Sequence, residues 1–218
     1  MKNIEIRCWL FNPCRTSCYV VSDIQSGECV VIDPCAYSPV ERARLINYIN
    51  KKNQRPCHVL LTHAHFDHVL STDLFADLFA LYPELHIDDA PLMPLVSPRI
   101  EEVFGTGVFR HEIVMPRTWL KDNDVIRFGN SKLTVIHTPG HTPGSVFYYC
   151  ETEGIAFSGD TLFVNDIGRT DLPYGSFEDI QKSLAYIINI LPDETKVYSG
   201  HDDRPTTIER ERQNLKLL

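Results

Sequence analysis

One stretch of the chain, V-L-L-T-H-A-H-F-D-H-V-L at positions 59–70, constrains the fold and the chemistry more than any other. Its first four residues are apolar or β-branched and predict a short buried strand. Four potential metal ligands then follow within six positions, namely His63, His65, Asp67 and His68. Three imidazoles and one carboxylate suit a borderline divalent ion such as zinc. We therefore expect a metal site where this strand ends.

The spacing of these ligands indicates two adjacent metal sites. Alternation along an extended backbone places His63 and His65 on the same side of the chain. A turn after them can bring Asp67 and His68 back toward the same point. Because four side chains this close in sequence do not easily converge on one tetrahedral ion, each pair needs further ligands from other parts of the chain.

The second half of the chain contains such residues, each at the end of a strand-like run. They occur in P-G-H-T-P-G-S at positions 139–145, S-G-D at 158–160 and S-G-H at 199–201. The three ligands in these motifs are His141, Asp160 and His201. A glycine precedes each of them and lets the backbone turn sharply and approach an ion closely.

The hydrophobic pattern predicts an α+β fold in a single domain, residues 1–218. Apolar strand-like runs occur in both halves, and Gly129-Asn130 indicates a hairpin in the second half. Two β-rich halves, each followed by a capped helix, predict two sheets packed face to face with helices outside, which gives four layers.

Helices are expected where capping residues precede a periodic apolar pattern, at Ser38, Ser176 and Thr206, the last with Glu209. A further helix is expected over 69–82. By contrast, the segment 83–116 contains five prolines, and we expect it to be an irregular crossing between the two halves.

Composition excludes several classes of function. The formal net charge of -8 disfavours binding to nucleic acid or to an anionic membrane. No apolar run approaches the length of a transmembrane helix, and the N-terminus lacks the apolar core of a signal peptide, so a cytoplasmic protein is expected. Seven cysteines without a C-x-x-C pair do not indicate a disulfide framework.

The motifs H-A-H-F-D-H, P-G-H-T-P-G-S, S-G-D-T-L-F and S-G-H, in this order, identify the chain as resembling the metallo-β-lactamase superfamily. Within it, I-G-R-T-D-L-P at 167–173 and P-T-T-I-E-R-E-R-Q-N-L at 205–215 resemble the short glyoxalase II-like hydrolases. The resemblance implies a four-layer αββα sandwich. It also implies one metal ion on His63, His65 and His141, and a second on Asp67, His68 and His201. Asp160 would bridge the two ions.

The resemblance further implies a hydrolase that uses two divalent ions, with zinc preferred and iron or manganese as alternatives. The small-molecule substrate is expected to be a hydroxyacyl thioester such as S-D-lactoylglutathione, attacked by metal-bound hydroxide. Asp67 would orient the nucleophile or accept its proton. Arg169 resembles the basic residue that contacts the thiol carrier, although it can equally serve as a donor that fixes its own loop. Tyr174 is a candidate for the wall of the pocket.

Other members of the superfamily provide alternatives. β-Lactamases of the commonest zinc subclass have cysteine in place of Asp160, which counts against a β-lactam substrate. A persulfide dioxygenase would use one iron on His63, His141 and Asp160, and this chain has all three. A lactonase or a phosphodiesterase could use the same dinuclear centre. Structural or surface roles are expected for the histidines that match no ligand position, His58, His86, His111 and His137.

Overall fold

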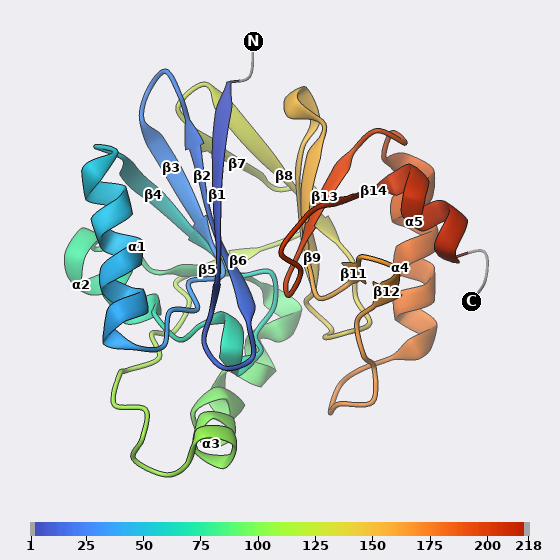
Figure 1. Ribbon diagram of the computed structural model, residues 1–218. Coiled ribbons are helices and arrows are strands. Elements are labelled where there is room, and N and C mark those ends of the chain that lie inside the picture. Colours follow the sequence, from blue (N-terminus) through green and yellow to red (C-terminus); the bar gives the residue numbers. More distant parts are fainter. Residues whose placement is uncertain (1–2, 216–218) are drawn as a thin grey trace.

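The protein is built on two six-stranded sheets packed face to face, as the computed structural model shows for residues 3–215. The first sheet has the order β1-β2-β3-β4-β5-β6 and the second the order β14-β13-β10-β9-β8-β7. Figure 1 shows the two sheets side by side, with helices on their outer faces. The predicted four-layer αββα arrangement is therefore confirmed.

Both sheets mix antiparallel and parallel pairs. The first sheet contains β1 (Ile4–Phe11), β2 (Thr16–Asp23), β3 (Glu28–Ile32), β4 (Arg55–Leu60), β5 (Pro83–His86) and β6 (Thr118–Leu120). Its first three strands are antiparallel, and β3 to β6 run parallel to one another. The second sheet contains β7 (Val125–Phe128), β8 (Ser131–His137), β9 (Val146–Cys150), β10 (Ile155–Gly159), β13 (Lys196–Ser199) and β14 (Thr206–Thr207). In it only β10 and β13 are parallel.

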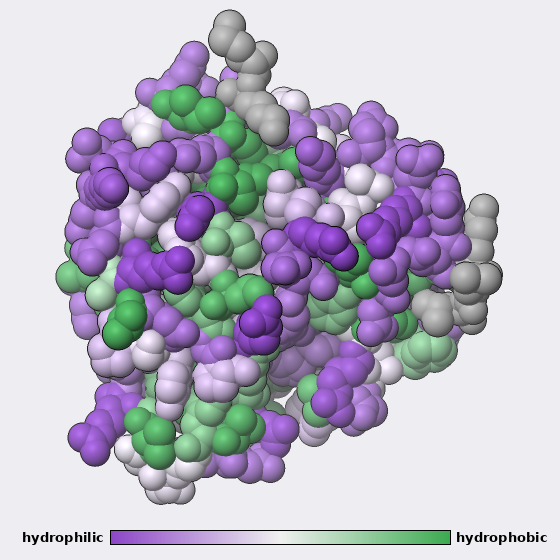
Figure 2. Space-filling model, in the orientation of Figure 1, coloured by the Kyte–Doolittle hydropathy of each residue, from purple (hydrophilic) through white to green (hydrophobic). Residues whose placement is uncertain are grey.

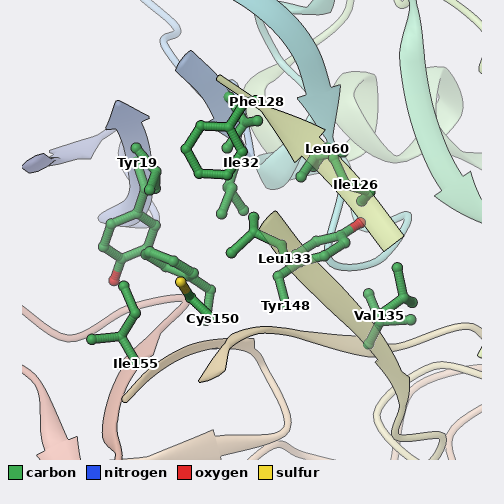
Figure 3. Packing of buried hydrophobic residues seen from close by; sticks show 14 of the residues in the cluster. Tyr19, Ile32, Leu60, Ile126, Phe128, Leu133, Val135, Tyr148, Cys150 and Ile155 are labelled. Carbon is green, nitrogen blue, oxygen red and sulfur yellow. The ribbon is translucent and has the colours of Figure 1, made fainter. Parts of the chain in front are cut away.

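Side chains of the two inner faces form the central core. Alternation along each strand sends every second side chain inward, so β2, β3 and β4 supply Tyr19, Ile32 and Leu60. From the second sheet, Phe128 and Tyr148 pack against them without exposed surface. Figure 3 shows these side chains meeting between the sheets. The packed sheets fix the strand ends relative to one another and so position the loops that follow.

Helices cover both outer faces (Figure 1). On the first sheet lie α1 (Pro39–Lys51) and α2 (Thr72–Phe79), and on the second lie α4 (Phe177–Ile190) and α5 (Ile208–Leu215). The expected capping box of α1 is present, because Ser38 and Glu41 satisfy each other's backbone N–H groups. Ser176 likewise caps α4 by accepting from the Asp179 N–H.

The prediction of an irregular segment over 83–116 is wrong for residues 83–104 and confirmed for residues 105–116, which contain no helix or strand. The segment contains β5, a 3₁₀ helix over Ile87–Leu92 and the helix α3 over Met93–Phe104. Pro94 lies in the first turn of α3, where the missing N–H costs nothing. Burial of Met93, Val96 and Ile100 then holds the helix despite Pro98 in its interior. Tertiary packing here overrides local propensity.

Two other helix boundaries differ from the prediction. The helix expected over 69–82 is shorter, since α2 spans only Thr72–Phe79 and ends at Ala80, whose φ is 54°. The cap of α5 is Thr207, whose hydroxyl accepts from the Arg210 N–H at 3.3 Å, and not Thr206. Thr206 instead lies in β14 and pairs with Val197 of β13. Among residues 3–215, no helix combines the length and apolar composition that crossing a membrane would require.

His58 links the two sheets through a partly buried hydrogen-bonded pair. Its Nδ1 contacts Glu84 Oε1 at 2.5 Å, and its Nε2 donates to the carbonyl of Arg127 on β7 at 3.1 Å. The hydrogen bond that His58 donates to Glu84 raises the pKa of His58 above 6.5. This effect outweighs burial, which lowers that pKa. Because both ring nitrogens donate, the folded state favours the imidazolium form.

We therefore expect His58→Gln to destabilise the protein in a pH-dependent way. A pKa raised on folding gives a stabilisation that is complete below the unfolded value and is lost as the pH rises through the folded value. The variant should lose about 1 kcal/mol of unfolding free energy near pH 6 and much less near pH 9. Urea unfolding at both pH values measures this. An equal loss at both would contradict the charged pair.

Candidate metal centre

Seven side chains gather where strands of both sheets end. His63 and His65 follow β4, and Asp67 and His68 lie in the adjoining 3₁₀ helix Phe66–His68. From the second sheet come the residues that follow β8, β10 and β13, namely His141, Asp160 and His201. The structure thus brings together all the ligand positions predicted from the sequence, and it does so at one edge shared by both sheets.

The ligand atoms form overlapping groups in which every atom lies within 4.8 Å of the others. These groups are His63, His65 and His141; His63, His68 and Asp160; and Asp67, His68 and His201. Asp160 lies between the first and third groups. Its Oδ2 is 3.5 Å from His141 Nε2 and 3.2 Å from His201 Nε2, and its Oδ1 is 3.4 Å from His68 Nε2. The arrangement can hold two ions with Asp160 between them.

Hydrogen bonds to the outer ring nitrogens orient four of the five histidines. The Nδ1 atom of His68 pairs with Asp33 Oδ2 at 2.9 Å, and that of His63 with Thr62 Oγ1 at 3.0 Å. His141 Nδ1 donates to the Arg169 carbonyl at 2.8 Å, and His201 Nδ1 to the Cys14 carbonyl at 3.1 Å. Each contact leaves Nε2 facing the site, which is how metal-binding histidines are usually held.

The seven residues fit divalent ions because three of their inner atoms lack partners. His63 Nε2, His68 Nε2 and Asp160 Oδ1 are buried and accept or donate no hydrogen bond within the described chain. Orphaned buried polar atoms are rare and costly. Here three of them converge in a setting of imidazole and carboxylate donors, which are ligands for zinc, iron and manganese. We therefore regard the cluster as a metal centre.

Electrostatics differ between the two sides of the cluster. Burial, together with the neighbouring histidines, lowers the pKa of His63 well below 6.5 and that of His65 to about 3. Burial also acts to lower the pKa of His68, but the carboxylates of Asp160, Asp67 and Asp33 outweigh it and raise the value. The side with His63 and His65 thus holds neutral imidazoles, which is the form that binds a metal.

Glycine is required where the backbone passes closest to Asp160. A Cβ at Gly200 would lie 1.9 Å from Asp160 Oδ1 and 3.0 Å from His68 Cε1. A Cβ at Gly168 would lie 1.7 Å from the Asp160 carbonyl oxygen. A side chain at Gly200 would displace the carboxylate that the two groups share, and a side chain at Gly168 would displace the backbone that carries it.

Asp89 supports the site and was not found by the sequence analysis. Its fully buried carboxylate accepts from the Ala64 N–H at 2.8 Å, from Thr142 Oγ1 at 2.8 Å and from the Gly144 N–H at 2.6 Å. One side chain thus ties the segment of His63 and His65 to the loop of His141. It lies in the proline-rich segment, and the sequence around it, E-L-H-I-D-D-A at positions 84–90, gives no signal for this role.

The residues predicted to contact substrate lie beside this centre. Arg169 and Tyr174 line a cavity of about 480 Å³ that also reaches His65, Asp67 and His201. The Arg169 guanidinium is exposed and makes two hydrogen bonds to Asp171, at 2.7 and 2.8 Å. Tyr174 is exposed as well. Their predicted roles remain predictions.

Other residues near the predicted site have structural contacts. Cys35 is fully buried, and its thiol donates to the Thr16 carbonyl at 3.2 Å. Asp202 accepts from the Val164 N–H at 2.9 Å and from Ser199 Oγ at 2.6 Å. Of the histidines outside the site, His86 and His137 stack on each other at 4.0 Å.

We expect Asp89→Asn to loosen the centre. The amide has one acceptor oxygen and places its NH₂ group against N–H donors, so at least one buried donor loses its partner. Unfolding free energy should fall by roughly 2 kcal/mol or more, and retained metal after dialysis should decrease. Asp88→Asn is the matched control, since Asp88 lies next in sequence but has a half-exposed carboxylate. Equal behaviour of the two variants would contradict the assigned role.

Comparison with known proteins agrees with this geometry. The probable metallo-hydrolase YqgX of Bacillus subtilis is 32% identical, over 93% of this chain and 92% of the relative. The mitochondrial persulfide dioxygenase ETHE1 of Homo sapiens is 30% identical, over 93% of this chain and 72% of the relative.

Solved structures match nearly the whole chain. The BLEG-1 B3 metallo-beta-lactamase has a TM-score of 0.83 and 32% identity, covering 96% of this chain and 97% of that one. TTHA1623 in a di-iron-bound form also has a TM-score of 0.83, with 30% identity and coverage of 97% and 100%. The family model of the metallo-beta-lactamase superfamily matches residues 11–201. This chain belongs to the metallo-β-lactamase superfamily.

Proposed function

We propose that this protein is a glyoxalase II-like hydrolase with a dinuclear metal centre, and that it cleaves a hydroxyacyl thioester such as S-D-lactoylglutathione. The proposal rests on one observation, namely that two neighbouring groups of candidate ligands lie side by side. His63, His65 and His141 form one group and Asp67, His68 and His201 another, while Asp160 faces both. A dinuclear hydrolase would use both groups.

Two divalent ions held here would polarise a carbonyl oxygen and lower the pKa of a water molecule. Asp67 acts on that water as the proton acceptor. Its Oδ2 accepts from Thr16 Oγ1 at 2.7 Å, which fixes the orientation of the carboxylate. The oxygen of the deprotonated water would form a bond to the thioester carbonyl carbon, the C–S bond would break, and the departing thiolate would take up the proton that Asp67 accepted. Zinc is the metal we propose, and iron or manganese would suit the same donors.

Arg169 contacts the thiol carrier in this proposal. It lies on the rim of the cavity, and its ion pair with Asp171 is exposed on both sides. An exposed pair of this kind is worth little and can open to a carboxylate of the carrier. Tyr174 forms part of the wall beside it.

A second candidate is a persulfide dioxygenase. The observation that favours it is the similarity to the human persulfide dioxygenase, at 30% identity. His63, His141 and Asp160 would then hold a single iron. This candidate and the hydrolase differ in the number of bound metals and in the need for His201.

A substrate comparison tests the proposal directly. Zinc-loaded protein should hydrolyse S-D-lactoylglutathione with a higher kcat/KM than any penicillin or cephalosporin. In parallel, iron-loaded protein is tested for oxygen uptake with glutathione persulfide. β-Lactam turnover without thioester turnover would refute the proposal, and oxygen uptake without thioester turnover would establish the second candidate.

His201→Ala separates the two candidates in one substitution. His201 Nε2 faces Asp160 Oδ2 at 3.2 Å and Asp67 Oδ2 at 3.6 Å, so its removal takes one donor from the second group. In the hydrolase we expect thioester kcat to fall about a hundredfold or more, with bound metal falling from two ions toward one. Oxygen uptake by a mononuclear dioxygenase should largely persist.

His111→Ala is the matched control for that experiment, because His111 is not one of the seven residues that form the ligand groups. Circular dichroism and metal analysis are made on the same samples. Full thioester hydrolysis by His201→Ala protein with one bound metal would overturn the dinuclear mechanism.

A further inference from the structure

The cavity beside the metal centre has an apolar wall that the proposed chemistry does not explain. One wall comes from the start of α3 and the residue before it, and the opposite wall from the loop that precedes α4. The side chains are Leu92, Leu95 and Val96 on the first wall and Leu172, Pro173 and Tyr174 on the second. The proposed thiol carrier accounts for the second wall, but hydrolysis of a small hydroxyacyl group such as lactoyl does not need the first.

Figure 1 shows α3 at the lower end of the molecule, and Figure 2 shows hydrophobic residues exposed there among hydrophilic ones. Leu95 is 48% exposed and lines the cavity, whereas Leu92 and Val96 beside it are buried. Leu95 therefore presents apolar surface inside the cavity, where a bound ligand can cover it.

The two arginines that line the cavity are each paired with an acidic neighbour. Arg99 pairs with Glu102 at 2.5 Å, one turn apart on α3, and Arg169 pairs with Asp171 at 2.7 Å. No unpaired basic side chain of the described chain faces the α3 side of the cavity. The apolar surface of Leu92, Leu95 and Val96 on that side is therefore suited to an uncharged, apolar group.

The opposite wall is held firmly in place. The Ser176 N–H donates to the Gly140 carbonyl at 2.7 Å, and the Gly175 N–H to the Leu172 carbonyl at 2.9 Å. Tyr174 has a φ of 71°, a left-handed conformation that a bulky residue adopts only when its surroundings impose it. A wall fixed in advance binds a ligand without a large entropy cost.

We propose that the acyl group of the substrate carries an aliphatic chain beyond its 2-hydroxy carbon, and that this chain packs against Leu92, Leu95 and Val96 of the α3 wall. The inference rests on the proposed thioester hydrolysis and narrows its substrate class. The carrier remains on the Arg169 side of the cavity, and the acyl chain occupies the α3 side.

A chain-length series tests this inference. Zinc-loaded protein is assayed with D-2-hydroxyacyl thioesters of glutathione that have three, four, six and eight acyl carbons. If each added methylene is buried, kcat/KM should rise about fourfold per methylene until the wall is covered. A kcat/KM that is flat or falls with length would overturn the inference and leave thioester hydrolysis intact.

Two aspartate substitutions on α3 locate the effect. Leu95→Asp should reduce the ratio of kcat/KM for the eight-carbon to the three-carbon substrate at least tenfold. Val103→Asp is the control, since Val103 is 43% exposed on the same helix, against 48% for Leu95, and does not line the cavity. An equal change of the ratio in both variants would contradict the assigned wall.

Binding of the product acids separates this inference from the proposed function. Calorimetry compares lactate with 2-hydroxyhexanoate and 2-hydroxyoctanoate on the zinc-loaded protein, without any thiol carrier or turnover. Affinity that rises with chain length, and does so less in Leu95→Asp, supports the apolar site even if no thioester is hydrolysed. Equal affinity for the three acids refutes the apolar site even if thioesters are hydrolysed.

Discussion

The carboxylate of Asp33 is the contact on which the metal centre depends. It follows β3 with a φ of 49° and accepts from the Thr62 N–H at 2.8 Å, from Thr62 Oγ1 at 2.7 Å and from His68 Nδ1 at 2.9 Å. Since the Thr62 hydroxyl in turn accepts from His63 Nδ1, one buried carboxylate orients a histidine from each side of the cluster. It also joins the ends of the parallel strands β3 and β4, so the fold and the site are fixed by the same interaction.

Burial strengthens these contacts, and it also raises the free-energy cost of any carboxylate that lacks partners. Asp33, Asp89 and Asp160 are all buried, and a buried carboxylate is tolerated only when its oxygens have partners. Asp33 and Asp89 obtain theirs from the chain, whereas Asp160 Oδ1 does not. The two fully satisfied carboxylates build a rigid frame, and the incompletely satisfied one marks where an ion is needed. Aspartate thus serves both purposes, as a support at Asp33 and Asp89 and as a candidate ligand at Asp160.

Sequence reasoning succeeded where the signal was local. The capping box of Ser38 and the hairpin at Gly129 each follow from a few neighbouring residues, and a strand before His63 was located, although it spans Arg55–Leu60 and not 59–62. The seven predicted ligands follow strand-like runs, and the structure brings them together. Sequence reasoning failed over 83–104, because β5 and α3 are stabilised by distant partners and not by propensity. Asp89 was missed for the same reason, since its role exists only once Ala64 and Gly144 have been brought to it by the fold.

The poorly predicted helix α3 also forms one wall of the cavity. Both features arise because α3 is held by tertiary packing and lies outside the two packed sheets. The ligands lie at the ends of strands whose places are set by the packed sheets, so their positions depend on the whole core. The wall made by α3 packs on the centre from outside, through Phe66 against Phe104 and through the buried Val96 and Ile100. A segment attached in this way can change its surface side chains, such as Leu95, without disturbing Asp33 or the ligands. Choice of substrate can therefore vary on this scaffold while the chemistry of the centre stays constant.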